Sequence, residues 1–257
     1  MLHRLTLASR FTLLALLPLA AGNLHAQPDL SGIWQLASRP MTSAQGYPPV
    51  PLTPLGQEKV DTYRSVVDPL GETPTLWCVS HGMPEMMMGG GSYPLEIIQQ
   101  PNQVTIISEW LSETRRIFLG ELQADDDAIF PSRQGYSKGH WEGDILVVET
   151  THLQEMVDSR YPHSTATTIT ERFSLSEDPD GTRRLVADTV VNDPQWLTEP
   201  LNYRLEWTPS AFSWVQPYEC MEELWLQRLR ELEAAALSTD AISSDAESDV
   251  ITASATN

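Results

Sequence analysis

The chain has none of the short sequence motifs by which many classes of enzyme are recognised. It contains no H-E-x-x-H, no G-x-S-x-G, no Walker loop and no G-x-G-x-x-G dinucleotide fingerprint. Each of these motifs places a metal, a nucleophile or a phosphate on a specific turn or helix. The sequence therefore gives no support to a zincin, a hydrolase with a nucleophile elbow, a nucleotide-binding protein or a Rossmann dehydrogenase, and we expect no cofactor.

Basic residues are also scarce. The chain has 16 Lys and Arg against 35 Asp and Glu, which gives a formal net charge of -19 at pH 7. Nucleic acids and anionic membrane surfaces attract basic patches, so both are poor partners for so acidic a protein. We expect a small molecule as the partner, and the sequence leaves the oligomeric state open.

Long apolar runs are absent beyond the start of the chain. The run FTLLALLPLAA at 11–21 follows a basic start and precedes a small-residue junction between Ala26 and Gln27. This pattern is typical of a cleaved signal peptide, and the run is too short for a permanent membrane helix. We expect residues 1–26 to be removed and the remainder to be a soluble periplasmic or secreted protein without membrane insertion.

Only two cysteines occur, Cys78 and Cys220. In an oxidising compartment, two cysteines so far apart in sequence favour one disulfide bond. Closing so long a loop could stabilise the fold by about 3–5 kcal/mol. The alternative is a pair of buried free thiols.

What the chain has in quantity is short strand-like runs. Residues 27–237 read as one domain with about eight to nine strands, joined mostly by tight turns as in an antiparallel meander. Such a meander is expected to close into a barrel because closure removes exposed edges. The predicted strands lie at 30–36, 94–100, 103–110, 113–120, within the hairpin 135–152, and at 167–176, 183–192 and 201–207.

Two helices flank these strands in the prediction. A short helix begins at Thr53-Pro54, with Val60, Tyr63 and Val67 on one face,. A second helix over 220–237 carries an apolar stripe and is expected to dock on the barrel. Residues 238–257 are mostly Ser, Thr, Ala and Asp and are predicted to form a disordered acidic tail,.

Two resemblances follow from these runs. Gly32-Ile33-Trp34 at the first strand resembles the G-x-W opening of lipocalins, which implies a cup-shaped barrel for a lipophilic ligand. The segments GHWEGDILVVETT, HGMP and PLEIIQQP are similar to a set of exported bacterial proteins of unassigned function, over about residues 28–225. That second resemblance implies no activity.

Glu171 is the most informative single residue. In TTITERFSLS it shares a face with Ile169 and Phe173, so it is predicted to point into the barrel,. Burial would raise its pKa and make it a candidate general acid or base. The alternative is a structural ion pair with an arginine of a neighbouring strand, Arg184 or Arg204.

Histidines and tyrosines supply the candidate partners of Glu171. His140 and Tyr136 share a strand face opposite Trp141, and they line the interior only if Trp141 faces outward,. Glu149 lies on a strand that is apolar on both faces, so its direction is undetermined. In the loops, a pocket mouth could gather three further residues for acid–base chemistry, namely His81, Tyr161 and His163,.

The segment CVSHGMPEMMMGGG at 78–91 allows two interpretations. Thioethers and imidazole are copper ligands, so His81 with the methionines could hold a copper ion. Methionine also lines adaptable apolar surfaces, and three glycines would make the segment mobile. We favour a pliable rim at the mouth of a pocket, with no metal.

These observations lead to one expected function and two alternatives. We expect a barrel that binds a small lipophilic or aromatic molecule; the alternatives are an acid–base isomerase, cyclase or lyase on the same scaffold, and a periplasmic copper-binding protein. The candidate catalytic residues are Glu171, His140, His81 and Tyr136. The candidate ligand-binding residues are Met83, Met86, Met87, Met88, Trp34, Trp141, Tyr203 and Trp207.

Overall fold

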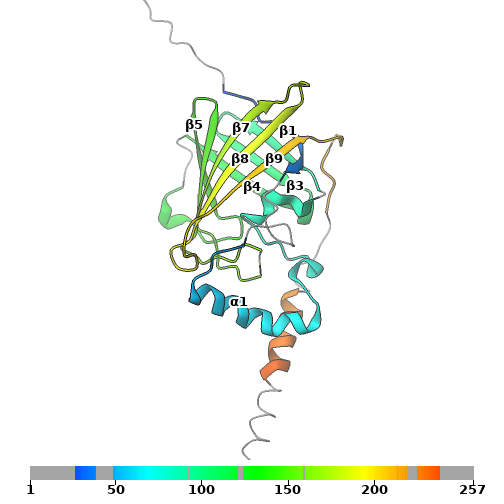
Figure 1. The fold of residues 1–257 in the computed structure, drawn as a ribbon, viewed down its shortest axis with the longest axis vertical. Helices are drawn as coiled ribbons and strands as arrows, with labels where there is room; N and C mark the ends of the chain where they lie inside the picture. The colour runs from blue at the N-terminus through cyan, green and yellow to red at the C-terminus, as the bar shows by residue number, and fades with distance from the viewer. Residues whose placement is uncertain are drawn as a thin grey trace, which may run out of the picture.

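A computed structural model describes residues 27–38, 49–91, 93–120, 124–158, 160–212, 214–218 and 225–237. Nine strands form one closed barrel in which each strand pairs with its neighbours in sequence, and β9 pairs with β1 (Figure 1). The predicted closed barrel is therefore confirmed. Its strands are β1 (Gly32–Ser38), β2 (Leu95–Gln100), β3 (Gln103–Ser108), β4 (Glu113–Leu119), β5 (Tyr136–Glu142), β6 (Ile145–Thr151), β7 (Thr168–Glu177), β8 (Arg183–Asn192) and β9 (Leu201–Pro209).

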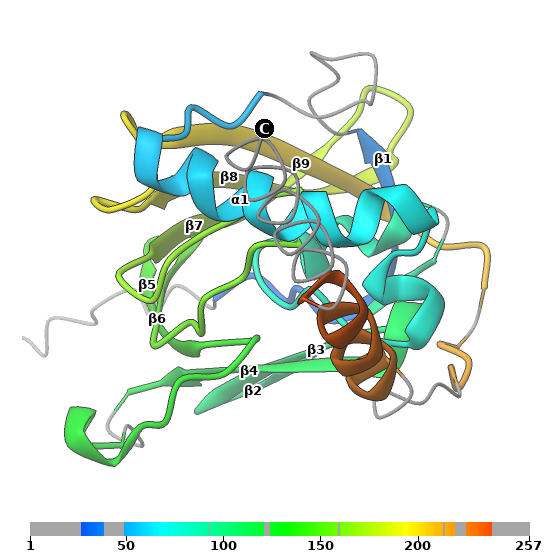
Figure 2. The same ribbon diagram turned by 90° about the horizontal axis from the view of Figure 1, so that it is seen from below.

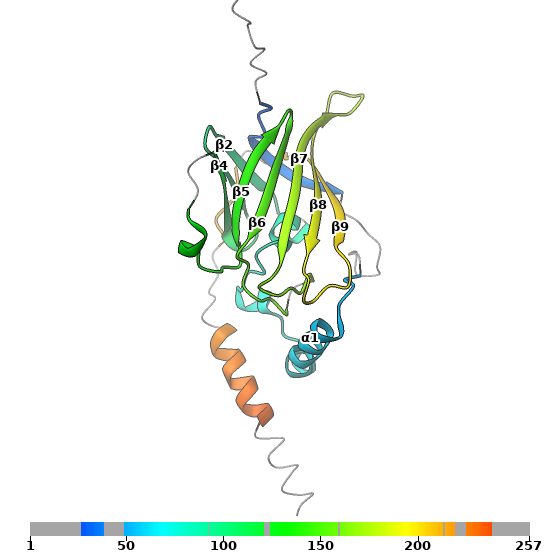
Figure 3. The ribbon, with the colours of Figure 1, turned by 90° about the vertical axis from the view of Figure 1, so that its left-hand side faces the viewer.

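The barrel is mixed, so the prediction of a wholly antiparallel meander is wrong at one step. An odd number of strands cannot alternate in direction around a closed sheet, which requires at least one parallel pair. That pair is β4 with β5, whereas the other neighbours run antiparallel (Figure 3). Strand β5 begins beside the middle of β4, with Ser137 opposite Ile117, so the chain must return along β4 before the pairing starts, as a parallel pair demands,.

A glycine allows the parallel pair to approach closely. The pairing joins residues 117–119 of β4 to residues 137–139 of β5. A Cβ atom on Gly139 would lie 2.8 Å from side-chain carbons of both Ile117 and Leu119. A larger residue at this position would require the side chains of Ile117 and Leu119 to shift.

Helix α1 (Pro54–Val67) lies across one end of the barrel (Figures 1 and 2). The Thr53 hydroxyl accepts a hydrogen bond from the Gly56 amide at 3.2 Å, and Pro54 occupies the first turn, where its missing N–H costs nothing,. A Cβ atom on Gly56 would lie 2.9 Å from the carbonyl oxygen of Trp196. Helix α1 is thereby fixed against the connection between β8 and β9.

The helix at 225–237 packs on α1 and the segment that follows it. Trp225 forms a small apolar cluster with Val67 and Val79, which is separate from the barrel core. The predicted docking of this helix on the barrel itself is therefore not confirmed; its described apolar contacts are with α1 and the segment after it. Short 3-10 helices complete the structure: η1 (Asp68–Leu70), η2 (Pro74–Trp77), η3 (Glu85–Gly91), η4 (Trp110–Ser112) and η5 (Asp126–Ala128).

Several predictions concern residues that the structure does not describe. The signal peptide, the acidic tail and Cys220 all lie outside the described residues, so the Cys78–Cys220 disulfide stays a prediction. Among the described helices, none has the length and apolar character needed to cross a bilayer.

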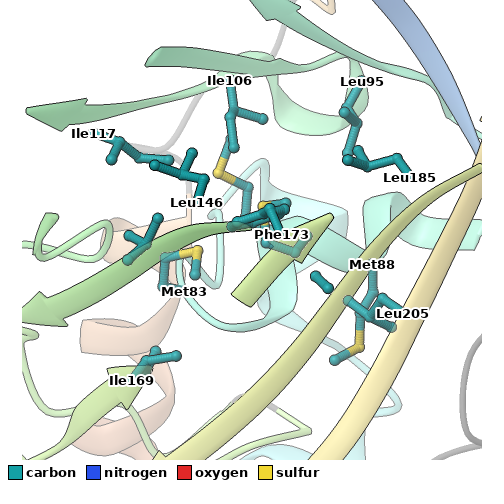
Figure 4. Close-up of a cluster of buried hydrophobic side chains, with 14 of the residues drawn as sticks. Met83, Met88, Leu95, Ile106, Ile117, Leu146, Ile169, Phe173, Leu185 and Leu205 are labelled. Atoms are coloured by element: carbon teal, nitrogen blue, oxygen red, sulfur yellow. The ribbon is translucent and has the colours of Figure 1, made fainter. Parts of the chain in front are cut away.

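The methionine-rich segment fills the barrel instead of edging its mouth. The side chains of Met83, Met86, Met87 and Met88 are at most 1% exposed and belong to the main hydrophobic core. Figure 4 shows Met83 and Met88 among strand residues that point inward. The interpretation of this segment as an exposed, pliable rim is therefore wrong. An unbranched thioether adapts to irregular gaps, which explains four methionines where strand side chains alone leave space.

We predict that Met88→Ala lowers the free energy of unfolding by about 2–5 kcal/mol, because it opens a cavity in a packed core. Met88→Leu keeps the volume and should cost less than about 1.5 kcal/mol. Urea unfolding followed by tryptophan fluorescence measures both. Equal stability of Met88→Ala and the parent protein would show that this side chain does not fill the barrel.

Candidate functional site

Glu171 points into the barrel, where it forms an ion pair with Arg115 of β4. Both side chains are at most 2% exposed. The Arg115 guanidinium donates to both Glu171 carboxylate oxygens, with Nη1 at 3.1 Å from Oε1 and Nη2 in a shorter contact with Oε2. It also donates to Ser137 at 3.0 Å and to Thr150 at 2.8 Å. One arginine thus joins four consecutive strands, β4 to β7, across the interior.

This geometry supports the structural interpretation of Glu171, with a different arginine from those expected. Arg184 pairs with Asp178, and Arg204 pairs with Asp188 on the exposed side of the sheet. A carboxylate with both oxygens bound to a buried arginine has no free oxygen for proton transfer. Glu171 is therefore a weak candidate for a catalytic acid or base.

Arg115 was not predicted to be buried, although the sequence contains a signal for it. In ETRRIFLG, Arg115 alternates in phase with Ile117 and Leu119, which are buried in the barrel. The same rule that singles out Glu171, a charged residue in an inward-facing apolar set, applies to Arg115. An acidic and a basic residue that are both predicted to point into the same barrel are expected to form an ion pair.

The other predicted catalytic residues of the sheet point outward. His140 is exposed and lies 3.2 Å from the Glu142 carboxylate. Tyr136 stacks on Phe118 and accepts a hydrogen bond from the Ala124 amide, and Glu149 is also exposed. Neither His140 nor Tyr136 joins Glu171: Trp141 packs against the core, so of the two strand directions that the sequence left open, the observed one places His140 outside.

The predicted aromatic ligand-binding residues belong to the packed core or its edge. Trp34 and Trp207 are each 1% exposed, and Trp34 Nε1 donates to the Leu30 carbonyl at 3.0 Å. Tyr203 is buried and stacks on Tyr161, while Trp141 is partly buried against the core. Burial, followed by the charge of Glu171, raises the pKa of Tyr203 well above its ordinary value. These side chains pack against one another instead of lining an open cup.

His81 lies in a different place, in a pocket at the end of the barrel that α1 covers. The pocket has a volume of about 250 Å³. His81 is 7% exposed; its Nε2 atom has no hydrogen-bond partner among the described residues, and its Nδ1 atom has only the Glu85 carboxylate at 3.3 Å. The pocket is lined by residues of α1, of the segment 68–75, of the segment after Cys78, of η4 and of the loop 157–160, including Tyr63, Asp68, Glu72, Thr75, His81, Glu85, Trp110, Asp158 and Arg160.

Glu85 is the closest charged group to His81. The His81 Nδ1 atom lies 3.3 Å from Glu85 Oε1, and Glu85 is itself buried. Burial of the imidazole opposes protonation, but the contact and charge of Glu85, with smaller contributions from Asp158 and Glu113, raise the pKa of His81 above its ordinary value. Glu85 therefore favours the protonated form of His81,.

Two further polar groups of this pocket lack a hydrogen-bond partner. Within the described part of the chain, the Tyr63 hydroxyl and Asp158 Oδ1 are buried without a partner in hydrogen-bond geometry, although the two groups are close enough for the Asp158 carboxylate to act on the hydroxyl. Burial raises the pKa of Asp158, although the charge of His81 opposes this, and burial with the charge of Asp158 raises the pKa of Tyr63. Unsatisfied buried polar atoms are rare in folded proteins, and a cluster of them marks a place that a ligand or water completes.

Glu113 fixes the segment that carries His81. Its Oε1 atom accepts hydrogen bonds from the Gly82 amide at 3.1 Å and from Gln134 at 2.7 Å, and it makes a shorter contact with the Ser80 hydroxyl. Burial raises the pKa of Glu113, and these donors partly offset the effect. Gly82 has φ +67, and a Cβ atom there would lie 2.1 Å from the Arg133 carbonyl oxygen, so only glycine fits.

His163 and Tyr161 are not part of this pocket. His163 is buried and contacts the Tyr161 carbonyl oxygen through Nδ1 at 2.7 Å, and burial lowers the pKa of its imidazole. Nearby, Asp193 accepts from the Ser164 amide and from the Thr167 hydroxyl, which ties the two long connections together. The sequence left open whether these loops meet; in the structure His163 and Tyr161 do not line the pocket of His81, although His163 lies near enough to Glu85 for the carboxylate charge to act on it.

The residues that line the pocket together with His81 could not be predicted from periodicity in the sequence. Asp158 lies in an irregular loop, and Tyr63 was assigned only to the packing face of a helix. Glu85 stands four residues after His81, a spacing at which side chains meet in a helix. The sequence predicted no helix at this segment, so it gave no reason to expect the pair. Among the described residues, no three His, Cys, Asp or Glu side chains form a group that could hold a metal ion.

We predict that Arg115→Met lowers the free energy of unfolding by about 3–5 kcal/mol, because it leaves Glu171 charged and unpaired in the core. The double variant Arg115→Met with Glu171→Leu should recover much of this loss. Denaturant unfolding of the parent, both single variants and the double variant gives the coupling. Additive losses in the double variant would show that the two residues do not act as a pair.

We predict that Asp158→Asn stabilises the protein at pH 7–8. The raised pKa in the folded state means that the ionised carboxylate disfavours folding, and this cost disappears as the pH falls towards its unfolded pKa of about 3.9,. The melting temperature should rise by a few degrees, since 1 kcal/mol corresponds to about 2–4 °C in a domain of this size.

The control for this prediction is Glu149→Gln, which changes an exposed carboxylate. Its melting temperature should follow that of the parent from pH 4 to pH 8. A lower melting temperature of Asp158→Asn at pH 8 would mean that the charged carboxylate is well satisfied in the folded protein.

Comparison with known proteins does not add to this picture. No protein-family model matches the chain, and no curated protein matches it significantly. The function must therefore be argued from the pocket and its charges.

Proposed function

We propose that the protein binds a small molecule in the pocket around His81, at the end of the barrel that α1 covers. The observation that carries this proposal is His81 itself, a buried imidazole whose Nε2 atom has no hydrogen-bond partner among the described residues and which lines a pocket of about 250 Å³. The unsatisfied atoms of Tyr63 and Asp158 in the same pocket support it. A ligand that supplies partners for these atoms would offset the cost of burying them.

The size and lining of the pocket define the kind of molecule. At about 250 Å³ it is smaller than typical pockets for drug-sized ligands, which begin near roughly 300 Å³,. Trp110 and Tyr63 provide aromatic walls, so an aromatic ring fits the site,. The expected ligand is thus compact and partly aromatic, and it carries polar groups that a purely lipophilic molecule does not have.

The lipocalin-like cup is retained in this proposal only in part. A closed barrel that begins near Gly32-Ile33-Trp34 supports the architectural likeness. The nine mixed strands and the methionine-filled core depart from an open eight-stranded cup,. We therefore place the ligand beside the barrel end instead of inside it, in a protein that we take to be exported.

An acid–base enzyme at the same pocket is the second candidate. His81 lies beside Glu85, which can orient the imidazole and stabilise its charged form,. Tyr63 and Asp158 provide a second pair of titratable groups that differ in their ordinary pKa. A substrate between these groups could lose a proton at one atom and regain it at another, as in an isomerase or a lyase.

Copper binding has less support. The four methionine side chains pack in the hydrophobic core, whereas His81 lines the pocket. A copper site needs thioether and imidazole groups to converge on one point. Metal analysis of the purified protein tests this alternative directly.

A fragment screen by thermal unfolding tests the proposed function. We expect compact aromatic molecules with polar substituents to raise the melting temperature, and Thr75→Trp to abolish the effect because the indole would occupy the pocket,. Thr105→Trp, on strand β3 away from this pocket, is the matched control and should respond like the parent. Unchanged binding by Thr75→Trp would exclude this pocket.

An enzyme is distinguished from a binding protein by testing whether the bound ligands are chemically converted. Deuterium exchange or rearrangement of a bound ligand, observed by NMR and lost in His81→Asn while binding persists, would support acid–base catalysis. Binding without any conversion in the parent protein would leave the simpler binding function.

A further inference from the structure

We propose that the pocket selects an organic cation, a compact aromatic ring bearing an ammonium or amidinium group, with Asp158 as its counter-ion. This inference rests on the proposed function, since it names the ligand class of the same pocket. The inference is drawn from the charged groups that line the pocket. The most important of them is Asp158, which has a buried oxygen without a hydrogen-bond donor among the described residues.

The pocket has more acidic than basic groups. Its lining includes the carboxylates of Asp68, Glu72, Glu85 and Asp158, together with the guanidinium groups of Arg64 and Arg160. The basic groups are at the solvent side, since Arg64 is exposed and the Arg160 side chain is 52% exposed. The deeper part of the pocket holds two carboxylates, Glu85 and Asp158, against the one imidazole of His81, so carboxylates outnumber cationic groups there even when His81 is charged.

Most of the carboxylates already have partners. Glu72 pairs with Arg228 at 3.2 Å and accepts a hydrogen bond from Trp77 Nε1 at 3.1 Å. Glu85 lies beside His81 and accepts from the Arg160 amide at 3.1 Å. Asp68 is exposed to water. These three acids do not require a ligand.

Asp158 differs from them. Its Oδ1 atom is buried and has no hydrogen-bond donor among the described residues. An acceptor in this position needs an N–H or O–H group, and a charged donor gives a stronger hydrogen bond than a neutral one. His81 and Arg133 place positive charge near Asp158, but neither donates a hydrogen bond to Oδ1, and a ligand cation would supply that donor together with a charge of its own.

The walls of the pocket suit the rest of such a molecule. Tyr63 and Trp110 line it, and the His81 and Trp110 rings lie with their centroids 6.1 Å apart. Aromatic rings attract cations over their faces and stack with the ring of a ligand. The acidity of the whole chain, with its net charge of -19, also draws cations to the surface from solution,.

A charge series of one shape tests the inference. Benzamidine, benzyl alcohol and benzoate are titrated into the full chain by calorimetry at one pH and moderate salt. We expect benzamidine to bind saturably, benzyl alcohol to bind more weakly and benzoate not to bind. Asp158→Asn should weaken benzamidine binding about 10- to 100-fold, the range expected for losing one charge-assisted hydrogen bond.

Two controls locate the effect. Glu149→Gln removes an exposed carboxylate elsewhere and should leave benzamidine affinity unchanged. Thr75→Trp should abolish binding, and the melting curves of all variants show that they fold.

The outcomes separate this inference from the proposed function. Benzyl alcohol or benzoate binding as well as benzamidine, with loss in Thr75→Trp, would overturn the cation inference and leave the pocket as a binding site. Benzamidine binding that survives Asp158→Asn would overturn the role of Asp158. Absence of benzamidine binding would overturn the inference, whereas the proposed function would then depend on the wider fragment screen.

Discussion

The ion pair between Arg115 and Glu171 is the interaction on which the rest of the barrel depends. A closed barrel of nine strands has an interior too wide to be filled by aliphatic strand residues alone. Arg115 of β4 crosses it to reach Ser137, Thr150 and Glu171 on the next three strands. Buried charges are tolerated only when each is paired and hydrogen-bonded, so this contact constrains the relative positions of four strands, including the parallel junction of β4 with β5.

The remaining interior space decides where a ligand can bind. Met83, Met86, Met87 and Met88 occupy it from a segment that is fixed at Gly82 and Glu113. His81 precedes these methionines in the same segment and lies outside the barrel core, in the pocket at the end that α1 covers. Filling the barrel and building the pocket are thus two results of one chain path. A cup that holds its ligand inside would need this segment to lie elsewhere.

The sequence predicted the strands well and the site poorly, for physical reasons. Alternation along β7 placed Glu171 inside correctly, and the same alternation applied to β4 would have found Arg115, because strand periodicity is a local property,. The alternation along β5 places His140 and Trp141 on opposite faces. It does not say which face is inside, and that became known only from the packing of Trp141 against the core. By contrast, Asp158 lies in an irregular loop, and no local rule brings it near Tyr63 of α1.

The sequence by itself determined the strands, their closure into a barrel and the acidic character of the chain. These follow from residue periodicity, turn residues and composition, which act over a few neighbouring positions. Only the tertiary structure decided that β4 and β5 run parallel, that the methionines are core, and that His81, Glu85 and Asp158 share a pocket. Each of these depends on how long connections cross the barrel end, and irregular connections carry no periodic pattern that would reveal their path.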